Sequence, residues 1–100
     1  MALVPMTQKE QDLTVKNVLS ACKDINKLNK RGYNFLYLAS GFIAHYDING
    51  FKSHYEDYSL IDDIKENANF NQWNNFRQGE RDYEYMMAKK AVYNKILEAL

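Results

Sequence analysis

The sequence has a single cysteine, no net charge and no long apolar run, and each shortage excludes a class of protein. Because Cys22 is alone, no disulfide can form within the chain, and its place on an apolar helix face predicts a buried thiol. Lysines plus arginines and aspartates plus glutamates number 13 each, so no overall field draws the chain to nucleic acid or to a membrane. No segment approaches the roughly 20 apolar residues that cross a bilayer, and no signal peptide is visible. We therefore expect a cytoplasmic protein in a reducing compartment, without membrane contact.

The chain does hold enough apolar material for one core. Apolar residues make up 46% and aromatic residues 14% of the 100 positions, which are the proportions of a globular chain rather than a disordered one. A chain of this length fits one domain. We expect residues 1–100 to form a single helical domain, in which residues 1–6, with the only proline, are a flexible arm.

The stretch from Tyr33 to Tyr46 contains no charged residue. Its apolar positions fall on every side of a helix rather than on one, so such a helix must be covered all round. We predict an all-α fold, a compact bundle of four to five helices around this central apolar helix. The alternative is an α+β fold in which residues 35–39 form a strand, since short aromatic and aliphatic runs suit either structure.

Local signals place further helices on both sides of the central one. Thr7 and Glu10 have the spacing of a capping box, so a helix should begin there. This helix can stop at Gly32, since glycine commonly follows a helix end. Asp47–Gly50 has the chemistry of a turn, and Ser59 can open a short helix after it.

The C-terminal third combines an irregular segment with a long helix. Residues 67–79 are rich in asparagine, which favours turns, so we predict a loop anchored by its aromatic side chains. These aromatics either close the core or form an exposed platform for a protein partner or for nucleic-acid bases. The candidate partner-binding residues of this loop are Trp73, Phe76 and Arg77. Residues 80–100 form a helix with a broad apolar band, which suits the core or a homo-oligomer.

Charge is distributed unevenly along the chain. Residues 1–31 hold six basic and three acidic side chains, a net +3, whereas residues 32–66 hold two basic and six acidic ones, a net −4. A basic stripe suited to the phosphates of nucleic acid consists of Lys9, Lys16, Lys23, Lys27 and Lys30, with Arg81 as a further contact. An acidic cluster suited to a protein partner consists of Glu56, Asp57, Asp62, Asp63 and Glu66. Either face could instead be an ordinary solvated helix surface.

A heptad pattern, G-F-x-small-H-Y-acid, occurs twice, nine residues apart, the first copy at residues 41–47. If the chain bends between the copies, four side chains with the chemistry of a metal or acid–base site could converge. These residues are His45, Asp47, His54 and Glu56. The same segment resembles an EF-hand calcium loop, with a histidine in place of the first aspartate. No third fixed ligand of recognised spacing accompanies the histidines, so packing is the competing interpretation.

Residues 41–47 and 71–77 resemble segments of small uncharacterised proteins of bacteriophages. That resemblance implies an accessory or inhibitory protein, and by analogy a binder rather than an enzyme. The sequence shows no nucleophile–base pair, phosphate loop or complete metal set. We therefore predict a non-enzymatic small binding protein, without a cofactor, that acts on a host or viral protein through the acidic cluster or the aromatic loop. The alternatives are a nucleic-acid-binding protein that uses the basic stripe and a metal-binding protein built on the two histidines.

Overall fold

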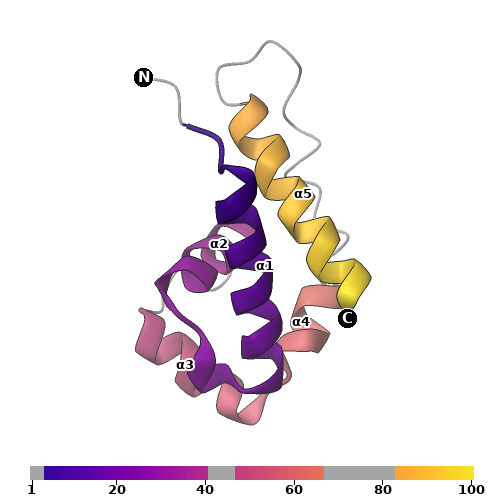
Figure 1. Ribbon diagram of the computed structural model, residues 1–100. Coiled ribbons are helices and arrows are strands. Elements are labelled where there is room, and N and C mark those ends of the chain that lie inside the picture. Colours follow the sequence, from indigo (N-terminus) through magenta and orange to yellow (C-terminus); the bar gives the residue numbers. More distant parts are fainter. Residues whose placement is uncertain (1–3, 41–46, 67–82) are drawn as a thin grey trace.

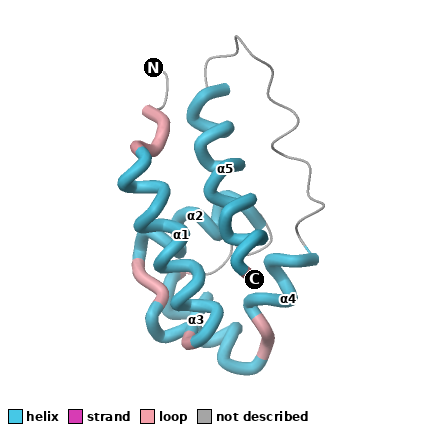
Figure 2. The backbone as a smooth tube through the Cα atoms, turned by 45° about the vertical axis from the view of Figure 1, so that its right-hand side comes forward, coloured by secondary structure: helices cyan, strands magenta, loops and turns pink. Residues whose placement is uncertain are grey.

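The computed structural model describes residues 4–40, 47–66 and 83–100, and most of these residues lie in α-helices (Figure 1). In chain order the elements are α1 (Gln8–Lys23), the 3-10 helix η1 (Ile25–Lys27), α2 (Lys30–Ser40), α3 (Ile48–Asp57), α4 (Leu60–Glu66) and α5 (Tyr83–Ala99). No strand occurs in the described ranges (Figure 2). The predicted all-α fold is confirmed. The alternative strand at residues 35–39 is wrong, because these residues belong to α2.

The first helix begins where its capping box predicts. The Glu10 backbone N–H donates to Thr7 Oγ1 at 3.1 Å, and the Thr7 N–H donates to Glu10 Oε1 at 3.0 Å. Both bonds satisfy backbone groups that have no partner inside the helix. The segment before the helix is fixed at its end, since Gln11 Nε2 donates to the Met6 carbonyl at 3.1 Å. Val4, by contrast, is 82% exposed.

The first helix ends at Lys23 rather than at Gly32, so the predicted stop is wrong. Asp24 adopts an extended backbone and caps η1 with its side chain. Asn17, inside α1, holds the connection that follows: its Nδ2 donates to the Lys27 carbonyl at 3.0 Å, and its Oδ1 accepts from the Asn29 N–H at 3.1 Å. One side chain thus replaces two backbone partners that a continuous helix would have supplied.

Gly32 lies instead in the first turn of α2, where that helix approaches α1. A Cβ atom on this residue would lie 2.2 Å from Asn17 Oδ1 and 2.9 Å from Leu28 Cδ1. Both separations are shorter than van der Waals contact. The missing side chain at Gly32 therefore permits the close approach of two helices and does not end one.

A single core draws side chains from every described helix. α1 packs against α2, α4 and α5, and it lies beside α5 in both views of the fold (Figures 1 and 2). In α2, Phe35 and Leu36 are buried, with 1% and 3% of their surface exposed. α1 therefore has the central place that we predict for the run Tyr33–Tyr46, and Asn34 of that run is exposed. Residues 41–46 of that run lie outside the described residues.

The turn predicted at Asp47–Gly50 is a helix start. Asp47 Oδ1 accepts from the Gly50 backbone N–H at 2.7 Å, so the aspartate caps α3 and the three residues after it are helical. The start predicted at Ser59 is confirmed, because Ser59 Oγ accepts from the Asp62 N–H at 3.2 Å at the beginning of α4. Asn49 and Gly50, which we predict to form a turn, thus belong to the first turn of α3.

The last helix is joined to α4 by the Tyr93 hydroxyl, which donates to the Ile64 carbonyl oxygen at 2.7 Å. Its predicted apolar band is directed into the core, and Leu97 and Leu100 pack against that core as half-buried side chains. Of the predicted helix at residues 80–100, residues 80–82 lie outside the described residues. None of the helices in the described ranges is long and apolar enough to cross a bilayer.

Candidate functional site

The predicted acidic cluster lies at the end of α3 and on α4. Four of its carboxylates are exposed, namely those of Glu56, Asp57, Asp62 and Glu66. Asp63 is half-buried and accepts a hydrogen bond from the Tyr55 hydroxyl at 2.6 Å. Between the two helices lies Tyr58, which is 65% exposed and stacks on the His54 ring, with 5.0 Å between the ring centroids and 22° between the planes. In the chain, an exposed aromatic ring that the sequence did not single out therefore lies between the acidic residues of α3 and those of α4.

The predicted basic stripe does not form one helical face. Its first three members, Lys9, Lys16 and Lys23, are exposed on α1. Because α1 ends at Lys23, Lys27 lies on η1 and Lys30 begins α2. All five lysines remain exposed, but the seven-residue spacing that united them applies only within a single helix.

The predicted metal site is not assembled in the part of the chain that the structure describes. There, no three His, Cys, Asp or Glu side chains are placed to hold a metal ion. Asp47 caps α3, and His54 stacks on Tyr58. Glu56 is exposed, and His45 lies outside the described residues. The calcium-loop interpretation is wrong, because most of the segment that would form the loop is the helix α3.

The remaining predicted contacts cannot be placed. Trp73, Phe76, Arg77 and Arg81 lie outside the described residues, as does the whole loop predicted at residues 67–79.

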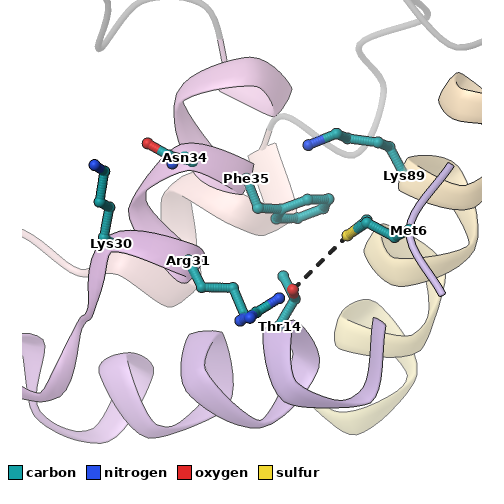
Figure 3. Close-up of a pocket in the computed structure, with 7 residues that line it drawn as sticks. All are labelled: Met6, Thr14, Lys30, Arg31, Asn34, Phe35 and Lys89. Carbon is teal, nitrogen blue, oxygen red and sulfur yellow. Dashed lines mark hydrogen bonds between the residues drawn. The ribbon is translucent and has the colours of Figure 1, made fainter. Parts of the chain in front are cut away.

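A pocket of about 410 Å³ lies where the segment before α1, α1 itself, α2 and α5 meet (Figure 3). Its volume is within the range of small-molecule sites, about 300–1,000 Å³. The residues that line it are Met6, Thr14, Lys30, Arg31, Asn34, Phe35 and Lys89. The pocket thus combines three cationic groups with a hydroxyl, an amide and two apolar side chains.

Lys89 is the most unusual of these residues, because it is charged yet only 9% exposed. Its Nζ lies 5.9 Å from the centroid of the Phe35 ring and 5.2 Å from that of Tyr85. No carboxylate among the described residues forms an ion pair with it. Every fully enclosed side-chain nitrogen or oxygen in the described chain has a hydrogen-bond partner. The Lys89 ammonium has no hydrogen-bond partner among the described residues, and Lys89 is one of the residues that line the pocket.

Burial of Lys89 follows from its place on α5. The residues of this helix that face the core are Met86, Lys89, Val92, Tyr93 and Ile96. Their spacing of three or four residues is that of one helical face. A lysine on such a face loses hydration, and contact with two aromatic rings compensates for only part of the cost.

Arg31 reaches the same pocket but is already paired. Its Nη1 lies 3.9 Å from Glu10 Oε2, and both side chains are partly exposed. Hydrogen bonds from the backbone N–H and the hydroxyl of Thr7, followed by the charge of Arg31, hold the pKa of Glu10 below its ordinary value. Glu10 therefore remains ionised and neutralises one of the three cations. Lys30, at the beginning of α2, is exposed and has no such partner in the described chain.

Thr14 forms the floor of the pocket on the α1 side. Its hydroxyl donates to the Glu10 carbonyl oxygen at 2.8 Å and lies 3.8 Å from Met6 Sδ. In Figure 3, Arg31 extends from α2 toward Thr14, and Lys89 extends from α5 over the Phe35 ring. Charged groups from two helices that are distant in sequence thus border one hollow.

One signal for this site is present in the sequence, although the predicted site residues did not include it. Lys89 lies at helical spacing from Met86, Val92 and Tyr93, so the apolar band of the last helix contains one lysine. No protein-family model, curated protein or solved structure matches the chain. The chemistry of the pocket and of the surface therefore has to carry the functional argument.

Proposed function

We propose that this protein is a non-enzymatic binding protein whose pocket between α1, α2 and α5 binds an anionic group. The observation that supports the proposal is Lys89, a nine-tenths buried lysine that faces two aromatic rings and no carboxylate of the described chain. An ammonium group has three N–H donors, and a bound anion would supply their acceptors. Buried polar groups in proteins are otherwise almost always hydrogen-bonded, so an open one marks a place for a ligand.

The other cations of the pocket fit the same function. Hydrogen bonds between ionised groups are about twice as strong as neutral ones, and they strengthen further where water is excluded. Lys30, exposed at the edge of the pocket, would attract an anion from solution. Phe35 and Met6 would contact whatever apolar part the anion carries.

Thermal unfolding in increasing concentrations of sodium phosphate, at constant ionic strength set with sodium chloride, tests this proposal. A ligand that binds only the folded state raises stability by RT ln(1 + [L]/Kd), so the midpoint temperature should rise with phosphate concentration. Lys89→Met should abolish this rise. Lys16→Met removes the same charge from an exposed position on α1 and should retain it. An equal response of both variants, or no response of the wild type, would refute the pocket as the anion site.

A second candidate function is binding of a basic protein partner by the acidic cluster. It is favoured by Tyr58, an exposed aromatic ring that stacks on His54 and lies in the chain between the acidic residues of α3 and those of α4. Tyrosine is enriched among the residues that dominate binding energy at protein interfaces, and acidic neighbours would steer a basic partner. The resemblance to small phage proteins supports a host protein as that partner.

Photocrosslinking distinguishes this second function. A photoreactive phenylalanine analogue at position 58 should give a discrete crosslinked product in a bacterial lysate. The double variant Asp62→Lys with Glu66→Lys should lose that product, because the steering charge is reversed. The same analogue at Leu13, which is 42% exposed on α1, is the control. Identical products from both positions would contradict a specific surface at Tyr58.

A further inference from the structure

We infer that the anion bound by the pocket is a phosphate monoester of an aromatic or other apolar group, an inference that rests on the proposed function. Three features of the pocket lead to this class of ligand: its uncompensated charge, the kind of cation that carries this charge, and its apolar lining.

The first feature is charge. The pocket has three cationic side chains, those of Lys30, Arg31 and Lys89, and one of them is paired with Glu10. Three positive charges less one negative charge leave two. A phosphate monoester carries about −1.5 to −2 near neutral pH, whereas a carboxylate carries −1. The dianion therefore matches the pocket better than a carboxylate does.

The second feature is that the two uncompensated cations are lysines. Lysine binds phosphate as a compact point charge with three donors, whereas arginine binds carboxylate and phosphate alike through its planar fork. Lys89 is nearly buried and Lys30 is exposed, so one cation lies deep and the other lies at the edge. Both residues line the pocket, Lys30 from α2 and Lys89 from α5.

The third feature is that part of the lining is apolar. Phe35 is 1% exposed and forms one wall, and Met6 forms another. A pocket of about 410 Å³ is larger than an inorganic phosphate requires. Burial of apolar ligand surface against these walls would favour binding. The phosphate would therefore be attached to a ring or a short apolar chain.

Isothermal titration of the wild-type protein with three probes tests this inference. Phenyl phosphate should bind at least about tenfold more tightly than inorganic phosphate, which lacks the ring, and than benzoate, which lacks the second charge. Lowering the pH from 7.5 to 5.5 should weaken phenyl phosphate several-fold, because the second pKa of a phosphate is about 6. Benzoate, ionised throughout this range, should change little.

Two variants connect the result to the pocket. Lys89→Met should weaken phenyl phosphate at least about tenfold, while circular dichroism confirms that the variant is folded. Lys30→Met, at an exposed position, should narrow the preference for phenyl phosphate over benzoate. Lys16→Met is the control and should leave both affinities within about twofold of the wild type.

The outcomes separate the two proposals. If benzoate or inorganic phosphate binds as tightly as phenyl phosphate, the pocket still binds anions. Its ligand is then not a phosphate monoester of an apolar group. If none of the three probes binds, the proposed function and this inference both fail. If phenyl phosphate binds tightly and the Lys89→Met variant binds it equally well, the ligand lies outside the pocket and the inference is overturned.

Discussion

At the scale of single residues, burial has different consequences for a charged group and for a neutral one. Lys89 is 9% exposed, lies over the rings of Phe35 and Tyr85, and has no carboxylate partner among the described residues. Tyr93 is also buried, but its hydroxyl has an acceptor in the Ile64 carbonyl. The first arrangement is costly without a ligand, and the second is stable as it stands.

Replacement of Lys89 by methionine should therefore not destabilise the unliganded protein. Methionine has a similar length and removes the desolvated charge, so we expect the free energy of unfolding to be unchanged or to rise by about 1 kcal/mol. Urea denaturation followed by circular dichroism measures it, with an unchanged slope as the sign of an unchanged fold. A loss greater than about 1 kcal/mol would mean that the contacts with Phe35 and Tyr85 stabilise more than desolvation costs.

Burial raises the pKa of the Tyr93 hydroxyl above its ordinary value of 10.0, and it raises the pKa of the Cys22 thiol above 9.0. The half-buried Cys22 thus agrees only in part with the buried thiol that we predicted. At a pH above its ordinary pKa, each of these groups holds more protons in the folded state than in the unfolded state. The stability that these two groups contribute is therefore fully present below about pH 9, and it is lost as the pH rises through the raised pKa values.

The variant Tyr93→Phe should reveal this linkage. At pH 7 the replacement should lower the free energy of unfolding by about 1 kcal/mol, because the Ile64 carbonyl loses its donor. Between pH 9.5 and 11 the difference in the free energy of unfolding between the variant and the wild type should become smaller. Urea denaturation across this range, with Cys22→Ala in both proteins to remove the thiol, measures the effect. A difference that stays constant with pH would show that the phenol does not titrate with unfolding.

At the scale of elements, the junction of α1 and α2 depends on one asparagine and one glycine. Asn17 holds the connecting backbone at two points, and Gly32 leaves room for it. The asparagine cannot move aside without losing both hydrogen bonds. Any side chain at position 32 must therefore displace either the asparagine or the helix.

Replacement of Gly32 by alanine should cost about 1–3 kcal/mol, the usual range for overpacking, although alanine is the better helix former. In an Asn17→Ala background the same replacement should cost clearly less, because the nearest clashing atom is gone. Chemical denaturation of the four proteins gives the coupling energy. Equal costs in both backgrounds would exclude Asn17 as the residue that requires the glycine.

At the scale of the whole molecule, the core is continuous from α1 to α5. Buried side chains of every described helix belong to one cluster, and the hydrogen bond between Tyr93 and Ile64 joins helices that the chain separates widely. α1 contacts three other helices, so its loss would expose most of that cluster. No described helix buries its apolar face without the others.

Thermal unfolding should accordingly be a single transition. For 100 residues we expect an enthalpy of about 60–80 kcal/mol at the midpoint, and the calorimetric value should equal the van't Hoff value. Differential scanning calorimetry measures both. A second transition, or a calorimetric enthalpy well above the van't Hoff value, would show that α5 or the α3–α4 pair unfolds on its own.

By itself the sequence determined the fold class and two helix starts, because these depend on neighbours a few residues apart. Apolar spacing indicated helices, and the caps at Thr7 and Ser59 are contacts within one turn. Only the tertiary structure decided where α1 ends, what Gly32 is for and where Lys89 lies, because Asn17, Leu28 and Phe35 come to these places through packing. The pocket belongs to this second group, since its cations come from α2 and α5 and meet only when both helices pack on α1.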